Sequence, residues 1–256
     1  MGKNNPKLTD NAAPATMILV VDDHPLMRMA LRTVVESRAE WSCCGEAADA
    51  DSTLQQLEAQ NPDLVLLDYY LKSGDGIDLI KEIRRRRDNV KILIISRYSD
   101  PEFVERALRA GADGYVIKEE SPAQLAEAIA LTLKGENYLS QSISGQVIKR
   151  MLTDHKDESN DLGQLSDREF QVLQLLAQGL GNKQIAAQLH LSPKTIGTYR
   201  EHLKEKLGLK DSQQLLMYAA RRFDDMAGDF QPSGVRFKNL PRTPRRNSGG
   251  GSGADG

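Results

Sequence analysis

Short runs of apolar residues alternate with amphipathic stretches along the first half of the chain. In the amphipathic stretches apolar residues recur every three or four positions, as at Ile77, Ile80 and Ile83, which is the spacing of one helix face. The apolar runs have the length of strands: MILVV (17–21), WSCCGEA (41–47), DLVLL (63–67), KILIIS (91–96) and GYVIK (114–118). Strands that are apolar on both faces are typical of parallel sheets covered by helices on both sides. The pattern therefore predicts a flavodoxin-like, doubly wound (βα)5 α/β fold over residues 17–140.

A purely helical pattern occupies residues 164–223. Ser166, with Glu169 three positions later, has the signature of a capping box, and Gly179 stands where that first helix should end. A last helix is expected over about 212–223, where closely spaced leucines supply an apolar face. This half of the chain is predicted to be a small all-α domain.

The middle of the helical region has the spacing of a helix-turn-helix. Asn182 is expected to cap a short helix that runs through Leu189. Ser192 and Pro193 supply the cap and the first position of the next helix, which should end before Gly208. In a helix-turn-helix the second helix enters the major groove of DNA. A plain four-helix accessory domain has similar spacing and is an alternative on these residues alone.

Polar sequence separates and flanks the two patterned regions. Residues 141–163 contain one short helical stretch, then become polar and acidic, and are interpreted as a linker. Residues 1–16 are expected to be a flexible N-terminus, and residues 224–256, rich in Gly, Pro and Arg, a disordered tail.

Composition indicates an ordinary globular protein, with 39% hydrophobic and 27% charged residues among 256. No apolar run approaches the ~20 residues that cross a bilayer, and the polar first residues have no apolar core of a secretory signal. We therefore expect a cytoplasmic protein with no membrane segment. The net charge of −2 conceals a division: residues 17–140 hold 15 Lys and Arg against 22 Asp and Glu, whereas residues 164–222 hold 9 against 5. A basic helical part favours a nucleic-acid partner.

Polar residues follow four of the five predicted strands at their carboxyl ends. Asp22 and Asp23 follow the first strand, Asp68 the third, Ser96 the fourth and Lys118 the fifth. In the strand order 2-1-3-4-5, the first and third strands are neighbours at the switch point of the sheet, where doubly wound folds bind ligands. The three carboxylates are therefore expected to lie close together.

Three neighbouring carboxylates repel one another, and a hard divalent cation relieves the repulsion. Mg²⁺ is the simplest such ion, and carboxylates, Mg²⁺ and one lysine are the parts used to handle a phosphoryl group. Asp68 would then be the nucleophile, because a carboxylate can form an acyl phosphate. Two functions share this chemistry: a phosphorylation-switched regulator, and an aspartyl-phosphate-type phosphohydrolase with an accessory helical domain. The short strand-to-helix loops supply no substrate cap and favour the regulator.

The same residues carry a resemblance to a known family. VVDDHPLMR, LLDYYLKSGDGIDLI, LIISRYSD and GADGYVIKEE resemble the receiver domain of bacterial two-component response regulators. The resemblance implies that Asp68 accepts a phosphoryl group from a sensor histidine kinase. It also implies a role for each remaining site residue: Asp22, Asp23, Asp68 and the backbone carbonyl of Tyr70 as Mg²⁺ ligands, Ser96 as the switch hydroxyl, Lys118 as the phosphate partner, and Tyr115 as the aromatic residue that changes rotamer.

The helical half resembles a second module. LSDREFQVLQLLAQGLGNKQIAAQLHLSPKTIGTYREHLKEKLGL is similar to the LuxR-type helix-turn-helix, and the two modules together identify the NarL/FixJ class of response regulator. The resemblance implies a transcription regulator that binds double-stranded DNA, and not an enzyme. It further implies that the last helix pairs two copies into a homodimer when the protein is phosphorylated or DNA-bound.

The second helix of the helix-turn-helix has one apolar and one polar side. Ile196, Leu203 and Leu207, with Tyr199 or Arg200, are expected to form the core stripe. The residues expected at DNA are Lys183, Lys194, Thr195, Gly197, Thr198, Arg200, Glu201 and Lys204. Thr198 and Glu201 are the predicted base contacts, and the lysines are predicted to reach phosphates.

Two of these positions have alternative interpretations. A carboxylate at Glu201 can instead form an intrahelical pair with Lys204 or Lys194. Gly197 stands where a lysine is frequent in the family, so either its backbone approaches DNA or a neighbour closely, or the glycine is merely tolerated at a cost of about 1 kcal/mol relative to alanine.

Overall fold

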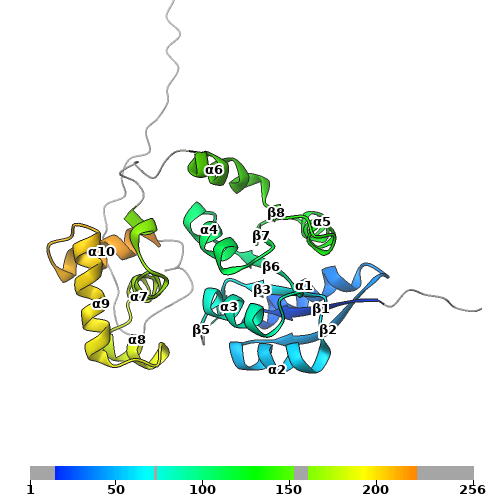
Figure 1. Ribbon diagram of the computed structural model, residues 1–256, viewed down its shortest axis with the longest axis horizontal. Coiled ribbons are helices and arrows are strands. Elements are labelled where there is room, and N and C mark those ends of the chain that lie inside the picture. The colour runs from blue at the N-terminus through cyan, green and yellow to red at the C-terminus, as the bar shows by residue number, and fades with distance from the viewer. Residues whose placement is uncertain (1–14, 72–73, 153–160, 224–256) are drawn as a thin grey trace, which may run out of the picture.

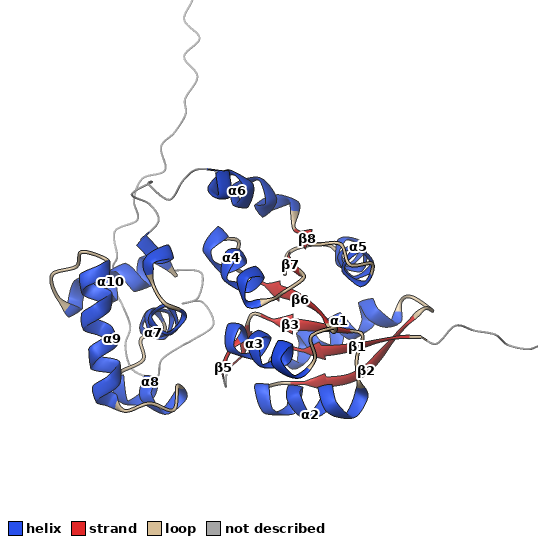
Figure 2. Cartoon of the chain, viewed as in Figure 1, coloured by secondary structure: helices blue, strands red, loops and turns tan. Residues whose placement is uncertain are grey.

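A computed structural model describes residues 15–71, 74–152 and 161–223, and its core is a parallel sheet (Figures 1 and 2). The strand order is β2-β1-β3-β6-β7-β8, which confirms the predicted 2-1-3-4-5 order for the first five strands. The strands are β1 (Thr16–Val21), β2 (Trp41–Ala47), β3 (Leu64–Asp68), β6 (Lys91–Ser96), β7 (Gly114–Ile117) and β8 (Tyr138–Leu139). The edge strand β8 and a small antiparallel pair, β4 (Tyr70–Leu71) with β5 (Gly74–Asp75), were not predicted, because two residues are too few to produce a pattern.

Helices cover both faces of the sheet. On β1, Ile18 and Val20 point to one face and Leu19 and Val21 to the other, and all four side chains are fully buried. The first face is covered by α1 (Pro25–Glu36) and α5 (Pro122–Leu133), and the second by α2 (Ala50–Gln60), α3 (Gly76–Arg86) and α4 (Pro101–Ala110). This explains why the strand sequences are continuously apolar rather than alternating. None of the helices in the described ranges is long and apolar enough to span a membrane.

The second half of the described chain is helical. It comprises η1 (Asp161–Gln164), α7 (Asp167–Ala177), α8 (Asn182–Gln188), α9 (Pro193–Lys206) and α10 (Ser212–Arg222). A further helix, α6 (Gln141–Leu152), occupies the start of the predicted linker and contacts α4. We call residues 16–152 the α/β domain and residues 161–223 the helical domain. The flexible N-terminus expected at 1–16 and the disordered tail expected at 224–256 lie almost entirely outside the described residues.

Local signals set the helix ends. The predicted capping box is present: the Ser166 side chain accepts the Glu169 backbone N–H, and Glu169 accepts the Ser166 N–H at 2.8 Å. Gly179 follows α7 with φ of +79°, a backbone conformation that favours glycine. The prediction for Asn182 was wrong, because Gly181 occupies the cap position and Asn182 is the first residue of α8. The Asn182 side chain instead accepts a hydrogen bond from a residue of α9.

The two domains meet along a seam centred on a buried arginine of α4. Arg106 is only 7% exposed, and it pairs with Glu102 of its own helix and with Asp167 of α7, each at 2.7 Å. The same guanidinium donates to the backbone carbonyls of Leu162 and Leu165 at 2.8 and 2.7 Å. Three hydrogen bonds from one guanidinium, to Asp167, Leu162 and Leu165, therefore fix the start of α7 against the α/β domain.

Aromatic contacts continue the seam beside Arg106. The guanidinium lies over the ring of Phe170, 4.4 Å from its centroid. Phe103 of α4 contacts Phe170 and Phe223 edge-on, at centroid distances of 5.2 and 5.9 Å, and stacks on Tyr98 at 4.7 Å. The two domains thus share one apolar core at this point, with further ion pairs at its rim between Lys81 and Asp167, Arg168 and Asp78, and Arg222 and Asp100.

Replacing Arg106 is expected to loosen the seam. Arg106→Met keeps most of the aliphatic volume but removes the ion pair with the nearly fully buried Glu102, and breaking a buried pair costs about 3–5 kcal/mol. The variant should show a larger radius of gyration in small-angle X-ray scattering and a lower free energy of unfolding.

Arg32 of α1, on the opposite face of the sheet, supplies the control. Its side chain is 51% exposed and pairs with Glu36, which lies one turn away on the same helix and is 46% exposed, at 2.8 Å. Arg32→Met should change neither quantity measurably, because an ion pair between two exposed side chains contributes little to stability. Equal behaviour of the two variants would show that the seam does not depend on Arg106.

Candidate functional site

Three predicted site residues converge at the carboxyl edge of the sheet. Asp22 follows β1, Asp68 is the last residue of β3 rather than the residue after it, and Lys118 follows β7. The Lys118 ammonium lies 2.8 Å from Asp22 Oδ2 and 2.8 Å from Asp68 Oδ2. Asp22 is fully buried and Asp68 is 4% exposed, so one cation is shared by two carboxylates that are almost out of water.

Asp23 completes the acid cluster together with a residue that the sequence analysis did not select. His24 Nδ1 lies 2.8 Å from Asp23 Oδ1 and 3.3 Å from Asp22 Oδ1, and the His24 backbone N–H donates to Asp22 Oδ1 at 2.8 Å. One ligand atom from each of Asp22, Asp23, His24 and Asp68 lies within 4.8 Å of the others. The sequence feature that could have pointed to His24 is its position directly after Asp22 and Asp23.

Burial and like charge make the cluster electrostatically unfavourable without a cation. Burial raises the pKa of the Asp68 carboxyl to about 7, opposed by Lys118 and assisted by Asp22. Burial also disfavours the charged form of Lys118, but Asp68 and Asp22 outweigh it and raise the pKa of the ammonium. Three carboxylates against one ammonium leave net negative charge, and oxygen ligands of this kind suit a hard divalent cation. The residues present therefore fit Mg²⁺.

After Asp68 the chain turns back in a short hairpin and stays close to the acid cluster. The Tyr70 backbone N–H donates to Asp68 Oδ1 at 3.2 Å, and Tyr70 pairs with Asp75 across the β4–β5 hairpin. Gly76 then donates its N–H to the Tyr69 carbonyl at 3.1 Å. A Cβ at position 76 would lie 2.4 Å from that carbonyl oxygen, so only glycine permits the approach.

The predicted switch residues lie along β6 and β7. Ser96 is 1% exposed, and its Oγ accepts the Tyr98 backbone N–H at 3.1 Å. The Tyr115 hydroxyl donates to the Tyr98 carbonyl at 2.9 Å, and burial raises the pKa of this phenol. Tyr98 thereby connects both residues to Phe103 and to the seam.

The second helix of the helix-turn-helix, α9, lies on the side of the helical domain away from the α/β domain (Figure 1). The expected core stripe of α9 is buried at Ile196, Leu203 and Leu207. On the other side Lys194, Thr198 and Glu201 are exposed, as is Lys183 of α8, whereas Thr195, Gly197, Arg200 and Lys204 are partly buried. The Ser192 side chain accepts the Thr195 N–H at 3.0 Å, as predicted for the helix cap.

The surroundings of three of these residues affect the roles predicted for them. Arg200 donates to Asn182 Oδ1 at 2.8 Å and braces α9 against α8. Lys204 pairs with Glu201 at 2.7 Å, which is the intrahelical alternative for that carboxylate. At Gly197 an added Cβ would meet nothing within 4 Å, so no neighbour in the described residues requires glycine there.

Comparisons with known proteins agree on both halves of the chain. A family model of the response regulator receiver domain matches residues 18–130, and a model of the luxR family of bacterial regulatory proteins matches residues 163–219. The nitrate/nitrite response regulator protein NarL of Escherichia coli K12 is 32% identical over 200 residues, which cover 78% of this chain and 92% of NarL.

Solved structures extend the likeness across both domains. RcsB of Salmonella enterica serovar Typhimurium, bound to a promoter with the phosphomimetic BeF3⁻, is 28% identical with a TM-score of 0.64, covering 80% of this chain and 98% of RcsB. A structure of two RcsB dimers bound to two parallel DNAs is 27% identical with a TM-score of 0.52 and the same coverage. These matches favour the regulator over the phosphohydrolase alternative. An acid cluster on a receiver fold, joined to a LuxR-type helix-turn-helix, places this chain in the NarL/FixJ class of response regulators, a family of DNA-binding transcriptional regulators.

Proposed function

We propose that phosphoryl transfer to Asp68 controls the DNA binding of this chain. In the proposal a receiver domain (17–140) and a DNA-binding domain (164–223) are joined by the segment 141–163. The observation that best supports the proposal is the position of the Lys118 ammonium, which lies 2.8 Å from Asp22 Oδ2 and 2.8 Å from Asp68 Oδ2. An Asp68 oxygen attacks the phosphorus of the donor, the bond from phosphorus to the donor's leaving group breaks, and an acyl phosphate remains.

The acid cluster is the proposed Mg²⁺ site. Asp22, Asp23, Asp68 and the Tyr70 backbone carbonyl would hold the ion, and Mg²⁺ when bound supplies charge neutralisation at the transferring phosphoryl group. Lys118 would exchange its contact with Asp68 for one to a phosphoryl oxygen. Ser96 would donate its hydroxyl to another phosphoryl oxygen, and Tyr115 would change rotamer with it.

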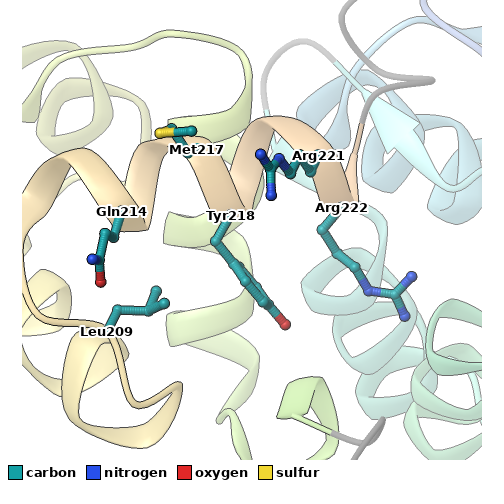
Figure 3. A pocket seen from close by; sticks show the side chains of 6 residues that line it. All are labelled: Leu209, Gln214, Met217, Tyr218, Arg221 and Arg222. Atoms are coloured by element: carbon teal, nitrogen blue, oxygen red, sulfur yellow. The ribbon is translucent and has the colours of Figure 1, made fainter. Parts of the chain in front are cut away.

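The proposed partners follow from the two domains. A sensor histidine kinase is the proposed phosphoryl donor, and double-stranded DNA the ligand of α8 and α9. For homodimer formation the support lies on α10, where Leu216 and Met217 are 40% and 43% exposed. Met217 also lines a pocket on this helix (Figure 3) with Leu209, Gln214, Tyr218, Arg221 and Arg222. Exposed apolar surface on one helix suits a second copy of the chain, and RcsB has been solved as DNA-bound dimers.

Asp68→Asn should abolish phosphoryl uptake while preserving the fold, because the amide keeps the volume of the carboxylate but is no nucleophile. The measurement is incubation of the full chain with acetyl phosphate and Mg²⁺, followed by mass spectrometry of the intact protein. Wild type should be modified, and excess chelator should prevent the modification.

An exposed carboxylate supplies the control for this experiment. Asp51 lies on the surface of α2, and Asp51→Asn should take up the phosphoryl group like the wild type. Stable modification of Asp68→Asn, or full modification of the wild type in chelator, would contradict the assignment of Asp68 or of the metal.

The exposed face of α8 and α9 gives a second test, which separates phosphate contacts from base contacts. Lys183→Ala should weaken binding to all duplexes alike and reduce the slope of log affinity against log salt by about 1. Thr198→Ala should instead cost about 1–3 kcal/mol on a preferred site, selected from a random-sequence library, and relax specificity at one base position.

Glu201 and Lys210 complete the set of variants. If Glu201→Ala tightens binding to every sequence equally, the carboxylate serves only its pair with Lys204 and reads no base. Lys210 is exposed beyond the end of α9 and outside the proposed interface, so Lys210→Ala is the matched lysine control. Equal salt slopes for Lys183→Ala and Lys210→Ala would remove Lys183 from the interface.

A further inference from the structure

One residue of the DNA-binding domain contacts the chain segment that follows the proposed phosphorylation site. Gln178, at the C-terminal end of α7, donates its side-chain amide N–H to the hydroxyl of Tyr70. Tyr70 lies two residues after Asp68, and its ring is half-buried against the core that the two domains share. The contact spans 108 positions of sequence and joins the helical domain to a residue two positions after Asp68.

The position of Gln178 is fixed by the seam rather than by its own loop. Arg106 and Lys81 hold Asp167 at the N-terminal end of α7. Gln171, one turn further along, donates to Asp78 Oδ2 at 3.1 Å. An eleven-residue helix is about 16 Å long, so anchors at its start and middle determine where its far end lies. That end lies at Tyr70.

Tyr70 is in turn tied to the acid cluster through its backbone. Its N–H donates to Asp68 Oδ1 at 3.2 Å, and strand pairing with Asp75 holds the same residue from the other side. The Tyr70 carbonyl is a proposed Mg²⁺ ligand. Outer partners that orient a metal ligand raise metal affinity because the ligand is ordered before the metal arrives. The hydroxyl contact with Gln178 is a third restraint of this kind.

We propose that Gln178 is a positioning residue for phosphoryl uptake, because it fixes Tyr70 and so preorganises the Mg²⁺ site of the receiver domain. The inference rests on the proposed function, and it makes the docked DNA-binding domain part of the support of the metal site. Mg²⁺ binding and domain docking then favour each other by the same factor, since coupling between two binding equilibria is reciprocal.

The test measures Mg²⁺ affinity directly. Gln178→Met keeps the length of the side chain and removes the hydrogen bond, and Tyr70→Phe removes it from the other partner while keeping the ring and the backbone. Each full-length variant should bind Mg²⁺ roughly two- to tenfold more weakly by isothermal titration calorimetry, the range expected for one neutral hydrogen bond. The double variant should be no weaker than either single variant, because the two changes remove the same contact.

A kinetic measurement separates positioning from general damage. At saturating Mg²⁺ the rate of phosphoryl uptake from acetyl phosphate should equal that of the wild type, and only the Mg²⁺ concentration giving half the maximal rate should rise. The matched control is Gln213→Met, an exposed glutamine of α10, which should leave both quantities unchanged.

Each outcome decides the proposal. Wild-type Mg²⁺ affinity in Gln178→Met, or additive losses in the double variant, would overturn it; if Gln178→Met does not fold, Tyr70→Phe carries the same decision alone. Failure of the proposed function is distinguishable, because it would appear as absence of Asp68-dependent uptake in the wild type. Uptake that depends on Asp68 but is indifferent to Gln178 would leave the function standing and remove only this inference.

Discussion

One ammonium group placed between two buried carboxylates is the constraint around which the receiver domain is arranged. Lys118 follows β7, Asp22 follows β1 and Asp68 ends β3, and these strands belong to one parallel sheet whose carboxyl ends form a common edge. Without Lys118 the two buried carboxylates would keep their contacts with His24 and with the Tyr70 backbone N–H but lose their shared cation, and removing one partner of a buried ion pair costs about 3–5 kcal/mol. A cation that enters the cluster would therefore compete with this ammonium, and a phosphoryl group would compete for it.

The seam connects the predicted switch residues of the receiver domain to the helical domain. Tyr98 accepts from Tyr115 through its carbonyl and stacks on Phe103, and Phe103 contacts Phe170 and Phe223 of the helical domain. The switch proposed for Ser96 and Tyr115 would therefore act on rings that are packed between the two domains. Because packed protein interiors have few voids, the neighbouring side chains must either prevent such a shift or move with it.

Sequence reasoning reached the sheet order and the acid cluster because both follow from local pattern and one topological rule. Apolar strands with Asp22, Asp23 and Asp68 at their ends needed no knowledge of distant contacts. Arg106 was not selected because an arginine on an amphipathic helix ordinarily lies in water, and its partners Leu162 and Asp167 are 56 and 61 positions away. The prediction that Asn182 caps α8 was wrong for a related reason, because its side chain accepts a hydrogen bond from Arg200, 18 positions later. DNA contacts and the tail from residue 224 stay predictions.

The contact between the two domains does not cover α9, the second helix of the helix-turn-helix. Lys194 and Thr198 remain exposed in the arrangement that Arg106 holds, and α7 rather than α9 faces the receiver domain (Figure 1). What docking does engage is the end of α10, where Arg222 pairs with Asp100 and Phe223 packs against Phe103. Among the described residues, α7 and α10 thus both contact the receiver domain, and α9 packs against these two helices as well as against α8. Under the proposed function, control through these contacts would act on the placement and pairing of α9 rather than by covering it, because docking leaves Lys194 and Thr198 exposed in the single chain.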